Sequence, residues 1–211
     1  MAIDVFRQIG AITRALSSRE VEGKPARVLT ASRTYDTGRT ELWDALTNIE
    51  RIPRWFMPIS GDLRLGGHYQ LEGNAGGEIV ACDPPQQFKI TWGMHGQVSW
   101  LTITLSEQAD DRTLLHLEHV AHVPDEMWDQ YGPGAVGVGW DGGLLGLDLY
   151  LSGNGSVTPE TAAEWSLSEE GKSFSRQSSD AWAEASIAAG TDADAARAGA
   201  ARTAAFYMGE E

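Results

Sequence analysis

The sequence predicts an α+β fold in which an antiparallel sheet precedes a long helix and a helical C-terminal extension. Between residues 61 and 122, hydrophobic residues recur at every second position and are separated by turns rich in glycine, proline and aspartate. Between residues 133 and 151 they recur at helical spacing. With 211 residues, 42% of them hydrophobic, the chain can bury a substantial core in one domain that carries such an extension.

The N-terminal segment, residues 1–25, is predicted to be a helical arm. Val5, Ile9, Ile12 and Leu16 follow one another at spacings of four, three and four, which places them on one stripe of an amphipathic helix. We expect this stripe to pack on the main domain, which the pattern assigns to residues 26–151.

The sheet is predicted from segments that alternate in hydrophobicity. Residues 27–35 are rich in valine, leucine and threonine and predict the first strand. A helical segment follows, and Pro53 interrupts it, so two short helices are expected instead of one. Hairpin-spaced strands then favour an antiparallel meander. The alternating segments are residues 62–65, 68–71, 78–81, 88–92, 101–105 and 113–122.

The helix predicted at residues 133–151 is unusually rich in glycine. Its six glycines together cost about 5 kcal/mol relative to alanine, because each destabilises a helix interior by nearly 1 kcal/mol. Burial must offset this cost, so we interpret the glycines as positions where the sheet, another helix or a ligand approaches closely. The alternative is that part of the segment is a loop. The glycines are Gly134, Gly137, Gly139, Gly142, Gly143 and Gly146.

The C-terminal extension, residues 152–211, is predicted to be helical. It begins at a turn-rich break over residues 152–155, and Pro159, Ser168 and Asp192 are suitable first residues or N-caps for three helices. Large apolar residues in this segment indicate that it packs on the core or on a second subunit instead of remaining a solvated tail. They are Trp165, Phe174, Trp182, Phe206 and Tyr207.

Charge and cysteine content restrict the possible partners. A formal net charge of -14 argues against binding nucleic acid or an anionic membrane, because both require a basic surface. Cys82 is the single cysteine, so no intrachain disulfide can form. The first residues lack the apolar core of a signal peptide, and no stretch has the roughly 18 apolar residues that span a bilayer. We therefore expect a cytoplasmic protein without membrane insertion.

A series of short motifs resembles a known superfamily. In order, these motifs are Trp-Phe-Met-Pro at 55–58, Asp-Leu-Arg-Leu-Gly-Gly at 62–67, Asp-Pro-Pro at 83–85, Ile-Thr-Trp at 90–92 and a glycine-studded segment at 132–151. Their order and spacing resemble the START-like helix-grip superfamily (SRPBCC). The most similar branch contains bacterial relatives of the activator of the Hsp90 ATPase.

The resemblance covers residues 26–151 and implies a curved antiparallel sheet wrapped around a long C-terminal helix, with an apolar cavity between them. The N-terminal helix and the C-terminal extension are additions that could cap the cavity or form a dimer interface. Superfamily members include chaperone activators, lipid carriers, hormone receptors and polyketide cyclases, so the fold does not specify the function. Chaperone activation is not expected here, because the eukaryotic activators use an additional N-terminal domain and the residues before Ala26 are too few for one.

Aromatic and apolar side chains are the candidate ligand contacts. Side chains of this kind form the walls of pockets that bind an apolar ligand, while a few polar groups orient the ligand. The same side chains could instead fill the core completely. The candidate ligand-binding residues are Trp55, Phe56, Tyr69, Trp92, Leu117, His119, Trp140 and Leu144.

Three histidines, His116, His119 and His122, are spaced by three residues on one predicted strand. Neighbours three apart in a strand point to opposite faces, so the three imidazoles are not expected to share a metal ion. His119 should face inward with Leu117, as a hydrogen-bonded core residue or as a polar contact for a ligand. Glu118 faces the other way and cannot easily pair with it, which weakens an acid–base mechanism.

The leading hypothesis from sequence is therefore a binding protein for a small hydrophobic molecule, with no catalytic residue and no metal. No nucleophile–histidine or phosphate-loop pattern occurs, and Gly137-x-Gly139 lacks the preceding strand of a dinucleotide-binding motif, so no cofactor is expected. Two alternatives stay open. One is a cyclase- or hydrolase-like enzyme that uses His119 with a cavity tyrosine or water, and the other is a homodimeric protein-interaction or stress-related module assembled through the extension.

Overall fold

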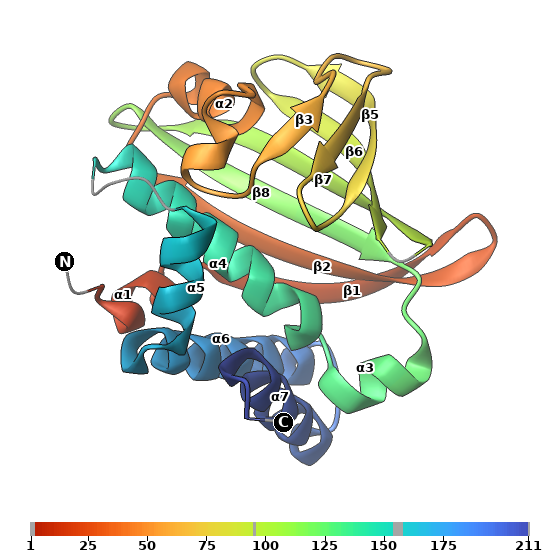
Figure 1. Cartoon of the computed structure of the whole chain (residues 1–211). Helices are drawn as coiled ribbons and strands as arrows, with labels where there is room; N and C mark the ends of the chain where they lie inside the picture. Colours follow the sequence, from red (N-terminus) through yellow and green to blue (C-terminus); the bar gives the residue numbers. More distant parts are fainter. Residues whose placement is uncertain (1–2, 95, 154–157, 211) are drawn as a thin grey trace. The chain divides into compact units, whose positions relative to one another are not determined.

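Eight strands form one curved antiparallel sheet in the part of the chain that the computed structural model describes, residues 3–94, 96–153 and 158–210 (Figure 1). The strand order is β1-β2-β8-β7-β6-β5-β4-β3. The strands are β1 Thr13–Val21, β2 Lys24–Tyr35, β3 Ile59–Gly61, β4 His68–Leu71, β5 Gly76–Asp83, β6 Gln87–Met94, β7 Gln97–Gln108 and β8 Arg112–Ala121. The helices are α1 Val5–Gly10, α2 Arg39–Thr47, the 3-10 helix η1 Ile52–Arg54, α3 Asp125–Tyr131, α4 Gly134–Leu151, α5 Pro159–Leu167, α6 Glu169–Ala188 and α7 Ala193–Met208.

The chain forms two compact units, and each consists of segments that are distant in sequence. The first contains Met1–Ala31, His122–Leu145 and Glu160–Glu211, and the second contains Ser32–Ala121 and Gly146–Pro159. Strand β2 and helix α4 therefore each contribute residues to both units. The division into consecutive segments 1–25, 26–151 and 152–211 stays a prediction.

From Glu160 onward, the helical extension is an integral part of the first unit. Helices α6 and α7 lie side by side (Figure 1), α6 packs against α1 and β1, and α7 packs against α3. The side chain of Ser168 caps α6 and that of Asp192 caps α7, as predicted, and Trp182 is completely buried. The expectation that the extension packs on the core is confirmed. Of the predicted turn at 152–155, Asn154 and Gly155 lie outside the described residues.

The N-terminal arm contains a short helix followed by a strand. The predicted helix is correct for α1, where Val5 and Ile9 are buried, but it is wrong beyond Gly10, because Thr13–Val21 forms β1. The backbone amide of Ala11 closes the last turn of α1, and the chain then pairs with β2 in the sheet. Hydrogen bonding to a neighbouring strand outweighs the helical spacing of the hydrophobic residues, a tertiary effect that local patterns do not contain.

The second unit is built on the antiparallel meander β3 to β8, as predicted, and α2 packs against β7 and β8. The two short helices expected around Pro53 are α2 and η1. The strand predicted at 62–65 is wrong, because β3 ends at Gly61 and the next residues form a turn. Arg64 pairs with Asp62 at 2.7 Å within this turn, and Leu65 is 64% exposed. Helix α3 was not predicted.

The glycine-rich segment is a helix throughout Gly134–Leu151; two of its glycines lie where a side chain has no room, and a third, Gly134, lies where the room is tight. A Cβ at Gly137 would collide with the indole of Trp182, one at Gly146 with the backbone carbonyl of Trp55, and one at Gly134 would lie 3.0 Å from Thr203 Cγ2. Close approach by helices α6 and α7 and by the segment after η1 therefore explains these positions. Gly142 instead faces open space.

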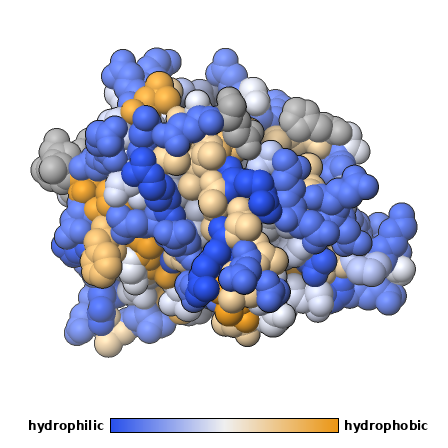
Figure 2. All heavy atoms as spheres, turned by 90° about the horizontal axis from the view of Figure 1, so that it is seen from below, coloured by the Kyte–Doolittle hydropathy of each residue, from blue (hydrophilic) through white to orange (hydrophobic). Residues whose placement is uncertain are grey.

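Hydrophilic side chains cover most of the face seen in Figure 2, and hydrophobic side chains appear in small groups between them. Large hydrophobic side chains are nevertheless exposed on helices of the first unit, namely Phe6, Met127, Leu167 and Phe206. The homodimer through the extension stays a prediction. No helix within the described ranges has the length and apolar character needed to cross a membrane.

Candidate functional site

One face of the sheet in the second unit is apolar and buried. Directly paired residues of antiparallel strands place their side chains on the same face. Leu101 pairs with His119, Ile103 pairs with Leu117, and Ile90 pairs with Leu101, so these side chains share a face that runs from β8 across β7 to β6. All five are less than 10% exposed. His119 therefore introduces a polar imidazole into an otherwise hydrophobic surface.

His119 is held by a hydrogen bond to the neighbouring strand. Its Nε2 lies 2.8 Å from Ser99 Oγ, and Ser99 Oγ donates to the backbone carbonyl of Trp92 at 3.1 Å. Because the serine proton is directed to that carbonyl, the hydrogen-bond geometry assigns a proton to Nε2, which donates to Ser99. Burial lowers the pKa of His119 to about 4, so the imidazole is neutral at neutral pH.

Two aromatic side chains continue from His119 along the sheet. The ring centroids of His119 and Trp92 are 6.5 Å apart in an edge-on arrangement, and those of Trp92 and Tyr69 are also 6.5 Å apart. The hydroxyl of Tyr69 donates to the backbone carbonyl of Thr91 at 2.8 Å, and burial raises its pKa. The structure thus brings three of the predicted ligand contacts together as a series of uncharged rings, with Leu117 on the same face as His119.

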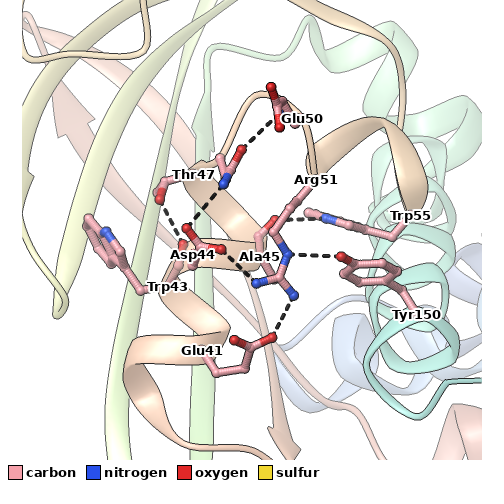
Figure 3. Close-up of polar contacts among 10 residues, drawn as sticks. Glu41, Trp43, Asp44, Ala45, Thr47, Glu50, Arg51, Trp55 and Tyr150 are labelled. Carbon is pink, nitrogen blue, oxygen red and sulfur yellow. Dashed lines mark hydrogen bonds and ion pairs between the residues drawn. The ribbon is translucent and has the colours of Figure 1, made fainter.

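Trp55 and Phe56 form another aromatic pair in the second unit, with ring centroids 5.4 Å apart. The indole nitrogen of Trp55 donates to the carbonyl of Ala45 at 2.9 Å (Figure 3), and the Trp55 carbonyl lies against Gly146 of α4. Both side chains are partly exposed. Backbone contacts to α2 and α4 thus position Trp55.

A polar cluster around Arg51 lies beside Trp55 (Figure 3). The Arg51 guanidinium donates to Glu41 at 2.6 Å, to Asp44 at 2.7 Å and to the hydroxyl of Tyr150 at 2.9 Å. Hydrogen bonding from Arg51 lowers the pKa of Asp44. Since Glu41 and Asp44 belong to α2 and Tyr150 to the last turns of α4, the cluster joins α2 to the end of α4. No pattern in the sequence indicated this cluster.

The remaining two predicted contacts, Trp140 and Leu144, lie one turn apart on the part of α4 that belongs to the first unit. Trp140 is 9% exposed and Leu144 is 4% exposed. Trp140 is adjacent in sequence to Asp141, which lies at the centre of a second polar cluster that was not predicted from the sequence.

The Asp141 cluster joins three elements of the first unit. Arg14 of β1 donates to Asp141 Oδ2 at 2.8 and 3.0 Å, and Ser178 and Trp182 of α6 donate to the same oxygen at 2.5 and 3.1 Å. Burial raises the pKa of Asp141, while Arg14 and the other two donors act in the opposite direction. An ionisable residue within the apolar pattern of residues 134–147 is the signal in the sequence that could have revealed this cluster.

The three histidines of the β8 region have separate partners. His119 contacts Ser99, His116 Nδ1 lies 2.7 Å from Ser32 Oγ, and His122 Nδ1 lies 2.9 Å from the carbonyl of Pro25. The predicted inward orientation of His119 is correct. Within residues 3–94, 96–153 and 158–210, no group of three or more His, Cys, Asp and Glu side chains is arranged to hold a metal ion.

Comparison with known proteins places this geometry in a family. A family model described as Activator of Hsp90 ATPase homolog 1-like protein matches residues 36–152. The crystal structure of CalU16 from Micromonospora echinospora is 33% identical, with a TM-score of 0.66, and the match covers 86% of this chain and 99% of CalU16. For the solution structure of CalU16 the TM-score is 0.69, at 33% identity and with coverage of 85% and 97%.

Protein MLL2253 from Mesorhizobium loti is 23% identical, with a TM-score of 0.54 and coverage of 60% of this chain and 97% of that protein, and this likeness supports the fold alone. A search of curated proteins found no match. The family match and the likeness to CalU16 agree with the resemblance found in the sequence motifs. The chain belongs to the family of Activator of Hsp90 ATPase homolog 1-like proteins, which have a START-like, ligand-binding fold.

Proposed function

We propose that this protein binds a small, mostly hydrophobic ligand against the buried sheet face that carries His119. The observation that supports this proposal most directly is the neutral imidazole at the end of the Tyr69–Trp92–His119 ring series. Aromatic walls with a few placed polar groups are the usual lining of small-molecule sites. Trp55, Phe56 and Leu117 complete the set of proposed contacts within the second unit, while the predicted contacts Trp140 and Leu144 belong to the first unit.

The chemistry of His119 selects the kind of polar group on the ligand. A neutral imidazole provides no positive charge, and because its Nε2 proton is donated to Ser99 its other ring nitrogen is an acceptor, so it favours a ligand hydroxyl over a carbonyl or a carboxylate. The surrounding leucine, isoleucine and aromatic side chains favour an apolar skeleton. A ligand of this type is expected to bind with micromolar affinity, which corresponds to about 8 kcal/mol.

Fluorescence titration with the uncharged dye N-phenyl-1-naphthylamine tests the proposal. We expect saturable binding to the parent protein and competition in which 2-naphthol displaces the dye better than 2-methylnaphthalene. His119→Leu should still bind the dye but lose the preference for 2-naphthol. His116→Leu, on the opposite face of β8, should behave like the parent. Absence of dye binding, or a preference that survives in His119→Leu, would contradict the proposal.

A hydrolase is the second candidate, because Ser99 Oγ and His119 Nε2 lie 2.8 Å apart, as in a nucleophile–base pair. The pKa of His119, near 4, makes the imidazole a weak base, and the hydroxyl of Ser99 donates to a backbone carbonyl instead. We therefore favour binding over catalysis. Hydrolysis of 4-nitrophenyl acetate that disappears in Ser99→Ala, but not in Ser106→Ala on the same strand, would reverse this preference.

A further inference from the structure

Arg33 of β2 is a buried cation in the second unit. Its side chain is 5% exposed, and its Nη2 lies 2.8 Å from Asp148 Oδ1. Asp148 belongs to the last turns of α4, in the segment that is part of the same unit, and its side chain is 28% exposed. An unpaired buried charge is costly, so Arg33 needs an anionic partner, whereas water can also solvate Asp148.

Arg33 points to the sheet face that carries His119. Strands β2 and β8 are neighbours, and Ser32 Oγ lies 2.7 Å from His116 Nδ1, so these two side chains share one face. Successive residues of a strand point to opposite faces, which places Arg33 with Leu117 and His119 on the other face. Because His116 precedes His119 by three residues, the Arg33 region and His119 are about 10 Å apart along the strands.

The pair with Asp148 indicates which ligand group suits Arg33. A guanidinium makes strong paired hydrogen bonds with planar anions such as carboxylates, and a carboxylate already lies against this one. Burial keeps water and salt away from the guanidinium, so they screen its charge weakly. Leu115 and Leu117 on the same face are also buried, and they favour an apolar skeleton next to the anionic group.

We propose that Arg33 binds the carboxylate of a hydrophobic ligand and that Asp148 is its counter-ion when no ligand is bound. The inference rests on the proposed function, because it places the carboxylate on the sheet face where the apolar skeleton binds. On binding, the partly exposed Asp148 side chain turns to water and the ligand carboxylate takes its place, so Arg33 is paired in both states. His119 and Arg33 recognise different groups of the ligand, a hydroxyl and a carboxylate.

The probes 2-naphthoate and 2-naphthamide have nearly the same shape and differ in charge, and displacement of N-phenyl-1-naphthylamine at neutral pH measures the affinity of each. Asp148→Asn removes the carboxylate that competes with the ligand. Asp44→Asn is the matched control, because it removes the same charge from a carboxylate that lies 2.7 Å from another arginine of this unit, Arg51. Arg33→Met combined with Asp148→Leu removes both charges and leaves neither partner buried without the other.

We expect the parent to prefer 2-naphthoate to 2-naphthamide. Asp148→Asn should raise this preference about two- to fivefold, which corresponds to the usual strength of a partly exposed ion pair. Asp44→Asn should leave the preference unchanged, and the double variant should bind the dye but lose the preference.

An unchanged preference in Asp148→Asn, or a preference that persists in the double variant, would overturn the inference and leave the proposed function intact. If one of these variants does not fold, the other decides alone, since each makes its own prediction. Absence of dye binding by the parent would instead overturn the proposed function. Calorimetry with 2-naphthoate and 2-naphthamide on the same variants would then decide whether Arg33 binds carboxylates.

Discussion

Replacing His119 with glutamine should remove part of the acid sensitivity of the fold. In the folded protein, burial lowers the pKa of His119 to about 4, from 6.5 in the unfolded chain. The unfolded state therefore binds a proton between these two values and the folded state does not. The stability that depends on neutral His119 is fully present above pH 6.5 and is lost as the pH falls toward 4.

The size of the effect follows from these two pKa values. At pH 5 His119 is largely protonated in the unfolded chain but not in the folded protein. The free energy of unfolding is therefore about 2 kcal/mol lower at pH 5 than at pH 7 on account of this residue. Glutamine has no such titration and can still donate a hydrogen bond to Ser99. The loss of stability between pH 7 and pH 5 should thus be about 2 kcal/mol smaller in His119→Gln than in the parent.

Urea unfolding at pH 7 and pH 5 measures this difference directly. Comparing the two pH values within each protein cancels the cost of the substitution itself and the titration of groups that both proteins share. His116→Gln retains His119 and should retain the extra loss of the parent. Equal losses in His119→Gln and the parent would refute the conclusion that His119 is buried in a neutral form.

Three further predictions test the packing within each of the two units. Gly137→Ala should destabilise the protein by about 1 to 3 kcal/mol through overpacking. Gly142 faces open space, so Gly142→Ala should stabilise the protein by up to about 1 kcal/mol. Equal effects of the two substitutions in thermal melts would contradict the conclusion that Trp182 approaches Gly137 closely. Tyr150→Phe should cost about 1 kcal/mol, because Arg51 loses a hydrogen-bond acceptor, and urea unfolding as stable as that of the parent would refute this role. Truncation after Gly153 removes the helices that cover α4 and should abolish cooperative unfolding, so a truncated chain that still melts cooperatively by circular dichroism would show that the extension is dispensable.

The local sequence determined most of the elements and the orientation of His119. Period-two alternation predicted the meander β4 to β8, because strand side chains must alternate between a buried and an exposed face. Ser168 and Asp192 marked the starts of α6 and α7, since capping is chemistry between near neighbours. Alternation along β8 likewise predicted that His119 and His116 point to opposite faces of the sheet. These features depend on interactions within a few residues or within one strand, so the pattern of residue types in the sequence is sufficient to predict them.

Tertiary structure decided the features that depend on partners distant in the chain. Strand β1 replaced a predicted helix because its hydrogen bonds are made with β2. Asp141 collects its donors from Arg14, 127 positions away, and from Ser178, 37 positions away. Gly137 and Gly142 are indistinguishable in sequence, yet one lies against an indole and the other faces open space. A linear pattern records which side chains are polar or small, but the energy of a buried charge or a missing Cβ depends on which atoms the fold brings next to it.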